Sequence, residues 1–310
     1  MGRITLIDEG LGLDQEWKTD PALDLDPTIT IHAVGDLHFG DELESRQDVA
    51  YVALEAMNGS YAKRVFCGDL TDNGYRGQWE DALAWIEGCS PEDWLAIPGN
   101  HDYNDGNPYT PGVDPQPSGY TWTDWEERSE GRPHRWVEDV GDYIRLIGLG
   151  ALDIRHELWP YYGYITEDMM NWVATQADTD RRCLLFFHVP LKDSVIEAGK
   201  VSGMYICHPH DDIIAWLDDL PSIKAWVSAH THSSLQAQNL VMPYQLPSRT
   251  MAHINVSAVH SSPVKPPQDY QNNISCFITV GEDRIDVRYL DHKKGTWAEY
   301  AGNTVTTIAV

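Results

Sequence analysis

Basic residues are scarce in this sequence. Its 310 residues include 22 lysines and arginines against 48 aspartates and glutamates, and the formal net charge at pH 7 is −26. A surface that binds extended nucleic acid needs clustered lysine and arginine side chains, because these neutralise the phosphates. The charge balance therefore argues against extended nucleic-acid binding. We interpret it as a source of solubility or as a salt-adapted surface.

Cysteine is also sparse. The five cysteines are Cys67, Cys89, Cys183, Cys207 and Cys276, and they are scattered along the chain. An odd and scattered set does not suggest a disulfide framework and is typical of a reducing compartment. We therefore expect a cytoplasmic protein.

Long hydrophobic runs are missing as well. No apolar run approaches the roughly 20 residues that span a bilayer. The first thirty residues contain no basic start followed by an apolar core, so we expect no signal peptide. Position 6 is neither serine nor threonine, which leaves N-myristoylation unsupported. We expect no membrane association.

Three common catalytic motifs are absent. The sequence contains no GxxxxGK[ST] phosphate loop, no GxSxG nucleophile turn and no HExxH zinc helix. The chemistries that depend on these motifs therefore lack support.

The chain is long enough for one large core or two modest domains. Without a central linker, a repeat or a low-complexity segment, we favour a single domain at 28–310. Residues 1–27 are polar and acidic, and we expect an N-terminal extension there. The segment 103–136 holds five prolines and shows little periodicity. A loop of that length predicts an insertion over the site, either a lid or a packed surface loop.

Short apolar strands alternate with helical patterns along the chain, which favours an α/β fold. Helices are expected at 47–57, at 76–87, from 166 onward and at 211–220. Strands are expected at 28–34, 63–67, 94–97, 143–149, 183–187, 225–228 and 253–259, followed by a hairpin at 274–290.

Metal-binding side chains follow five of these strands at the point where each strand ends. The ends read GDLHFG, GDLTDNG, PGNHD, HVP and AHTH. Ligand groups gather at the carboxyl ends of strands in α/β sheets, so we expect these side chains at one edge. The seven candidates are Asp36, His38, Asp69, Asn100, His188, His230 and His232.

Two pairs among the seven are two residues apart, Asp36 with His38 and His230 with His232. On an extended backbone both members of such a pair point to the same side. One histidine at a strand end is more commonly a buried histidine with its hydrogen bonds satisfied. Five coincidences of this kind favour a metal site.

Oxygen and nitrogen ligands of this kind suit manganese, iron, zinc and similar ions. Two divalent ions with Asp36 and Asp69 leave a formal charge of +2, a locally cationic pocket that favours a phosphate or phosphodiester. Two metals about 3.5–4 Å apart can hold a bridging hydroxide and clamp the oxygens of an in-line displacement at phosphorus.

The ordered series D-x-H, GDLTDNG, GNHD, a strand-end histidine and H-x-H resembles the calcineurin-like metallophosphoesterases. It looks most like their class III cyclic-nucleotide phosphodiesterase branch. The resemblance implies an α/β fold, a four-layer α-β-β-α sandwich of two mixed β-sheets flanked by helices (the metallo-dependent phosphatase fold). It also implies two divalent or trivalent transition-metal ions, drawn from Mn, Fe, Zn or Ni.

The resemblance divides the seven side chains between two ions that share Asp69. The first ion would be held by Asp36, His38, Asp69 and His232. The second ion would be held by Asp69, Asn100, His188 and His230.

Two further residues receive catalytic roles from the resemblance. His101 would contact the scissile phosphate or protonate the leaving oxygen, and Asp72 would orient His101. In the GNHD stretch we expect Gly99 to permit the turn, while Asp102 has no assigned role. Asn255 is a candidate for supporting the ligands, because the family often places a strand-borne asparagine near this point.

The chain departs from the relatives at a few positions. Ala229 stands where they usually have glycine before H-x-H, and its methyl group could crowd the turn. Asn73 and Asp102 differ from the arginine and glutamate of the protein Ser/Thr phosphatases, which argues against that branch. No tyrosine occupies the ligand position of purple acid phosphatases.

These observations favour a dinuclear metal-dependent phosphohydrolase, specifically a phosphodiesterase on a small or cyclic-nucleotide-like phosphodiester. A phosphomonoesterase and a DNA nuclease remain alternatives on the same site. A non-catalytic, metal-stabilised binding module is a third alternative. His101 and Asp72 argue against it, because a purely structural metal site needs neither residue.

Overall fold

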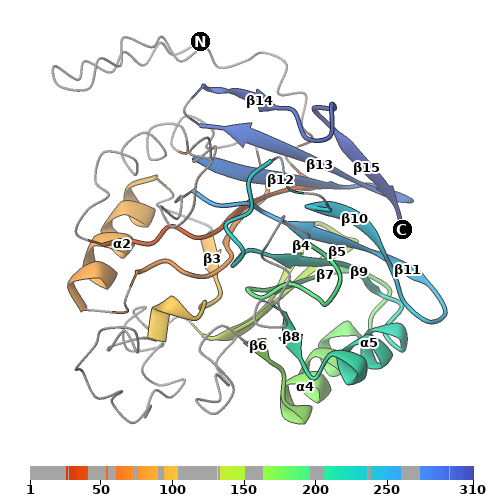
Figure 1. Ribbon diagram of the computed structural model, residues 1–310. Helices are drawn as coiled ribbons and strands as arrows, with labels where there is room; N and C mark the ends of the chain where they lie inside the picture. The colour runs from red at the N-terminus through yellow and green to blue at the C-terminus, as the bar shows by residue number, and fades with distance from the viewer. Residues whose placement is uncertain are drawn as a thin grey trace, which may run out of the picture.

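A computed structural model of the chain gives the arrangement of its two large β-sheets and of the helices packed against them (Figure 1). The expected helix at 47–57 lies outside the described residues except for Leu54, and so does most of the expected insertion at 103–136. The described residues are 26, 28–40, 54, 61–72, 74, 76–89, 94–103, 131, 133–150, 163–195, 206–235, 237, 239–259, 273–292 and 294–310.

The first sheet contains seven strands. They are β1 (Thr30–Val34), β2 (Lys63–Phe66), β3 (Trp94–Ala96), β12 (Ile274–Val280), β13 (Arg284–Asp291), β14 (Thr296–Ala298) and β15 (Thr306–Ala309). Their order is β14-β13-β12-β1-β2-β3, and β15 pairs with β13. Strands β1, β2 and β3 run parallel to one another, whereas β1 and β12 are antiparallel.

The second sheet contains six strands. They are β4 (Arg135–Val140), β5 (Ile144–Leu149), β7 (Arg182–Phe187), β9 (Ile223–Ser228), β10 (Val241–Gln245) and β11 (Thr250–Asn255). Their order is β10-β11-β9-β7-β5-β4, with parallel central pairs and an antiparallel pair at each side. A separate parallel pair joins β6 (Gly163–Tyr164) to β8 (Cys207–His208).

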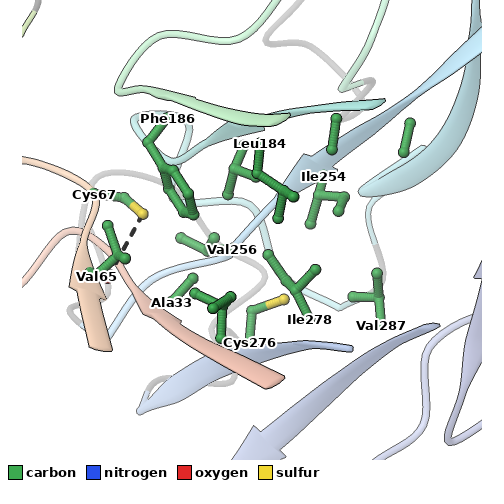
Figure 2. Close-up of a cluster of buried hydrophobic side chains, with 14 of the residues drawn as sticks. Ala33, Val65, Cys67, Leu184, Phe186, Ile254, Val256, Cys276, Ile278 and Val287 are labelled. Carbon is green, nitrogen blue, oxygen red and sulfur yellow. Dashed lines mark hydrogen bonds between the residues drawn. The ribbon is translucent and has the colours of Figure 1, made fainter. Parts of the chain in front are cut away.

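The main core lies between the two large sheets (Figure 2). Ile31 and Ala33 alternate with outward-facing residues along β1, and both belong to this buried cluster. From the second sheet Leu184 and Phe186 reach the same cluster. The alternation of strand side chains thus divides each sheet into an inner and an outer face.

Helices cover both outer faces. The described elements are α2 (Arg76–Cys89), α4 (Glu167–Ala177), α5 (His210–Asp218) and the 3₁₀ turn η1 (His101–Tyr103). The apolar stripe of α2 buries Trp79 and Ile86 against the first sheet, and α4 and α5 pack on the second. Thr166 caps α4 by accepting a hydrogen bond from the Met169 N–H at 3.2 Å. The layers confirm the expected four-layer α-β-β-α sandwich of two mixed sheets.

Several strands were not expected from the sequence. Strand β4 carries charged residues and begins inside the segment 103–136, and β10 contains Pro243, which a central strand would not tolerate. Both lie at edges of the second sheet, where such residues are compatible with pairing. The strand expected at 253–259 is observed at Thr250–Asn255.

The fold brings the carboxyl ends of five strands together from both sheets. Strands β1, β2 and β3 are neighbours in the first sheet, and β7 and β9 are neighbours in the second. The sequence predicted one sheet edge, but the first sheet contributes three strand ends and the second contributes two.

None of the helices in the described part of the chain has the length and hydrophobicity that spanning a bilayer requires.

Candidate metal centre

The backbone is left-handed at five of the seven candidate ligands. The φ angles are 52° at Asp36, 47° at His38, 51° at Asp69, 69° at His230 and 46° at His232. These five are half of the ten described non-glycine residues with positive φ. Such conformations are costly and cluster at functional sites.

The paired ligands do not converge through the alternation of an extended strand, as their spacing had predicted. Strand β1 ends at Val34 and β9 ends at Ser228, so neither pair lies on an extended strand. The turns after the strands bring the side chains together, and alternation along a strand does not.

The first cluster gathers four side chains whose ligand atoms all lie within 4.8 Å of one another. His38 Nε2 lies 2.8 Å from His232 Nε2 and 3.5 Å from Asp69 Oδ2. His232 Nε2 lies 3.7 Å from Asp36 Oδ1. Two imidazole nitrogens and two carboxylates that converge on one point form a donor set that suits a transition-metal ion.

The second cluster shares Asp69 with the first. Ligand atoms of Asp69, His188 and His230 lie within 4.8 Å of one another. His188 Nε2 is 3.2 Å from Asp69 Oδ2 and also 3.2 Å from the Asn100 side-chain oxygen. The opposite nitrogen, His188 Nδ1, donates to the Cys67 carbonyl at 2.7 Å, which orients Nε2 toward the cluster.

Asp69 belongs to both clusters. Its Oδ2 lies 3.5 Å from His38 Nε2 and 3.2 Å from His188 Nε2, while its Oδ1 accepts the His101 N–H at 2.8 Å. Burial alone would raise the pKa of Asp69, but His188 and His101 outweigh it and hold that pKa well below its usual range. Burial would likewise lower the pKa of His188, but Asp69 outweighs it and raises that pKa to about 9.

The donor chemistry therefore fits two transition-metal ions. The two clusters offer only nitrogen and oxygen atoms, and two of the donors are carboxylates. The clusters meet at one carboxylate that can face both ions. All seven side chains named from the sequence are brought together at this place.

His101 lies beside the first cluster and is half-buried. Its Nδ1 donates to the Asp72 backbone carbonyl at 2.7 Å, and its ring packs edge-on against His38 with centroids 4.6 Å apart. The Asp72 carboxylate lies 3.3 Å from His38 Nδ1. Asp72 thus holds His101 through its main chain, and its carboxylate is placed to orient His38, a contact that the sequence did not indicate.

Close backbone approaches explain the glycines around the centre. A Cβ atom on Gly99 would overlap the Oδ1 and N atoms of Asp69. Gly99 is not one of the glycines with a positive φ angle, so its backbone conformation does not require a glycine. The close approach to Asp69 requires one instead. A Cβ on Gly68 would lie 2.5 Å from His188 Nδ1, and Gly68 also has a φ of 92°.

Ala229 is accommodated by a glycine on the facing strand end. A Cβ on Gly35 would lie 2.7 Å from the Ala229 methyl carbon. The missing side chain at position 35 thus leaves room for the methyl group at position 229. The turn before His230 is also held by Asn255, whose Nδ2 donates to the Ala229 carbonyl at 2.7 Å.

The sequence model of the calcineurin-like phosphoesterases matches residues 29–234, a range that contains all seven candidate ligands. The chain belongs to the calcineurin-like phosphoesterase family. Membership together with the two clusters implies a metal-dependent phosphoesterase with two transition-metal ions. No curated protein matches the chain.

Two solved structures have similar folds. A dimetal phosphatase from Danio rerio is 14% identical, with a TM-score of 0.61 over 92% of this chain and 99% of that one. A purple acid phosphatase from yellow lupin (Lupinus luteus) seeds is 13% identical, with a TM-score of 0.58 over 91% of this chain and 53% of that one. Both agree with the metallo-dependent phosphatase fold.

Proposed function

We propose that this chain is a dinuclear metal-dependent phosphodiesterase that hydrolyses a small, cyclic-nucleotide-like phosphodiester. One observation carries the dinuclear assignment. Asp69 Oδ2 lies 3.5 Å from His38 Nε2 and 3.2 Å from His188 Nε2, so one carboxylate oxygen serves two ligand sets. The first ion would be held by Asp36, His38, Asp69 and His232, and the second would be held by Asp69, Asn100, His188 and His230.

When bound, two such ions would supply an activated water for attack on phosphorus and positive charge for the phosphate oxygens. His101 supplies the proton for the leaving oxygen. A carbonyl oxygen can only accept, so the contact with Asp72 keeps a proton on His101 Nδ1. In the protonated ring, Nε2–H is then the donor available to the substrate.

The charge around the centre acts on both candidate esters. Two divalent ions with Asp36 and Asp69 give a formal charge of +2, while the whole chain carries −26. A monoester dianion is repelled twice as strongly as a diester monoanion by the surrounding negative field, but the +2 centre also attracts it twice as strongly. The proposed preference for a diester therefore rests on the order of the sequence motifs. The same field opposes DNA, the polyanionic substrate of the nuclease alternative.

A phosphomonoesterase on the same centre is the nearest alternative. The two solved structures described above are both called phosphatases, at identities of 14% and 13%. At those identities the likeness concerns the fold and leaves the choice of ester to an experiment.

The deciding experiment compares the two esters directly. Metal-stripped protein, reloaded with Mn²⁺, is assayed with bis(p-nitrophenyl) phosphate and with p-nitrophenyl phosphate, and then with 3′,5′- and 2′,3′-cyclic nucleotides. We expect metal-dependent turnover with kcat/KM higher for the diester. A higher kcat/KM for the monoester would establish the alternative, and nicking of plasmid DNA would establish the nuclease.

Folded protein that binds metal but hydrolyses no ester with Mn²⁺, Zn²⁺, Ni²⁺ or iron would exclude the proposed activity. In that case the metal-stabilised binding module would be the remaining explanation.

A further inference from the structure

Asp102 is a buried carboxylate with no part in either ligand cluster. Only 2% of its surface is exposed. Its Oδ1 accepts hydrogen bonds from the Thr71 N–H at 2.9 Å and from the Thr71 hydroxyl at 3.1 Å. Its Oδ2 accepts the Gly99 N–H at 2.8 Å. Both carboxylate oxygens are therefore engaged as acceptors.

These contacts join two loops that carry functional side chains. The loop after β2 holds Asp69, and the loop after β3 holds Asn100 and His101. Asp69 Oδ1 accepts the His101 N–H at 2.8 Å, and Asp102 accepts the Thr71 N–H in return. Each loop thus offers the other a carboxylate that accepts a backbone N–H.

The loop after β3 needs such an anchor. Strand β3 has only three residues and lies at the edge of the first sheet, so it pairs with β2 on one side. Gly99 lets this loop approach Asp69 without an intervening side chain. Asp102 accepts the backbone N–H of Gly99, and Asp69 accepts the backbone N–H of His101. Asn100 lies between these two anchored residues.

We infer that Asp102 is a positioning residue that locks the loop of Asn100 and His101 onto the loop of Asp69. It sets the Asn100 oxygen relative to the ligands of the second ion, and it sets the His101 ring relative to the leaving oxygen. The effect on turnover rests on the proposed function, whereas the effect on metal binding does not.

The variant Asp102→Asn tests this with little change in volume. An asparagine oxygen can still accept one of the two backbone N–H groups. Its amide nitrogen then points a donor at the other N–H, so one anchor becomes a contact between two donors. The matched control is Asp291→Asn. Asp291 is also buried and accepts a backbone N–H, from Lys294 at 3.0 Å within its own turn.

The measurement is a titration of metal-stripped protein with Zn²⁺ in competition with a chromophoric chelator, which resolves the affinities of the two sites. We expect Asp102→Asn to weaken one of the two sites by roughly 10–100-fold, the usual scale for residues that orient ligands. The other site, and both sites of Asp291→Asn, should bind as in the wild type. Asp102→Glu, which restores a carboxylate, should recover part of the lost affinity.

Wild-type affinity at both sites of folded Asp102→Asn would overturn the inference, whether or not the protein hydrolyses any ester. Two tight sites without esterase activity in the wild type would instead contradict the proposed function. If turnover is present, Asp102→Asn should lower kcat more than it changes KM.

If Asp102→Asn does not fold, Thr71→Val decides the question. It removes the hydroxyl that donates to Asp102 and that also accepts the Gly74 N–H at 3.2 Å, and it keeps the Thr71 N–H. The lost hydrogen bond to Asp102 should weaken the same site by about fivefold. Unchanged Zn²⁺ affinity at both sites of Thr71→Val would overturn the inference.

Discussion

Single atoms set the distances between the loops at the metal centre. Gly99 and Gly68 lie against Asp69 and His188, and a methyl group at either glycine would enter space that a ligand occupies. Gly35 makes the opposite accommodation for the methyl group of Ala229. At these positions the absence of a side chain is the functional property.

Gly99→Ala should abolish metal binding at the centre. The added methyl group overlaps Asp69 Oδ1, so this carboxylate must move away from both ligand sets. We expect Zn²⁺ stoichiometry by elemental analysis to fall from two toward zero per chain. Gly77→Ala in α2 is the control, because nothing lies within 4 Å of the added atom. Two tightly bound ions in Gly99→Ala would contradict this assignment.

Asp69→Ala should lose both ions together. One oxygen of this carboxylate faces ligands of both clusters, whereas Asp36 lies in the first cluster. We therefore expect elemental analysis to find neither metal in Asp69→Ala, while Asp36→Ala should lose the first ion preferentially. Wild-type metal content in Asp69→Ala would show that Asp69 is not a shared ligand.

His101→Asn should separate chemistry from metal binding. His101 contributes its backbone N–H to Asp69, and the substitution keeps that contact. We expect both ions to be retained and kcat to fall by roughly 10²–10⁴-fold, the usual scale for a positioned acid. Turnover equal to that of the wild type would remove His101 from its proposed role.

At the scale of elements, a network of hydrogen bonds between polar side chains crosses the outer face of the first sheet. Arg64 of β2 donates to the carbonyl of Cys89, the last residue of α2, at 2.8 Å, and to His32 Nδ1 of β1 at 3.0 Å. His32 Nε2 then carries the proton and donates to the Ser275 hydroxyl at 2.8 Å. His292 Nε2 contacts the same hydroxyl at 2.8 Å. This hydrogen-bond network connects the end of a helix to three neighbouring strands and to the turn after a fourth strand.

The two buried histidines of this hydrogen-bond network predict a loss of folding stability in acid. Burial, with Arg64 nearby, lowers the pKa of His292 to about 3, and burial also lowers the pKa of His32 well below its usual value. The unfolded chain binds these protons near pH 6.5, so the contribution is fully present above that pH and declines as the pH falls toward 3. Between pH 7 and 5, His292 alone accounts for about 2 kcal/mol.

Urea unfolding of metal-stripped protein at pH 7 and pH 5 measures this contribution. His292→Gln should reduce the loss of stability between the two pH values, and His210→Gln, at a partly exposed position that begins α5, should not. An equal loss in wild type and His292→Gln would contradict the argument.

For the whole molecule, the acidic composition predicts stabilisation by salt. A net charge of −26 repels itself in the compact state, and the Debye length shortens from about 30 Å at 0.01 M salt to about 3 Å at 1 M. We expect the thermal midpoint to rise by at least about 2 °C between 0.02 M and 0.5 M NaCl, which corresponds to roughly 1 kcal/mol of screened repulsion. Equimolar sucrose is the uncharged control, and a lower midpoint in salt would refute the prediction.

The identities of the candidate ligands could be predicted because their signals are local. Short strands such as 63–66 and 182–187 are followed closely by Asp69 and His188, and the central strands formed close to where the sequence pattern indicated. The edge strands β4 and β10 were missed because their pairing depends on neighbours distant in sequence, which override the charged residues and the proline.

The sequence by itself determined which side chains stand at the strand ends, in what order, and hence the family and the fold. The resemblance implied that two ions share Asp69. Only the tertiary structure placed one oxygen of Asp69 close to both His38 and His188, the Asp72 carboxylate at His38, and Asp102 between two loops. The physical reason is distance along the chain. A strand end is encoded by adjacent residues, whereas a shared oxygen or a reciprocal hydrogen bond exists only after separate loops have packed together.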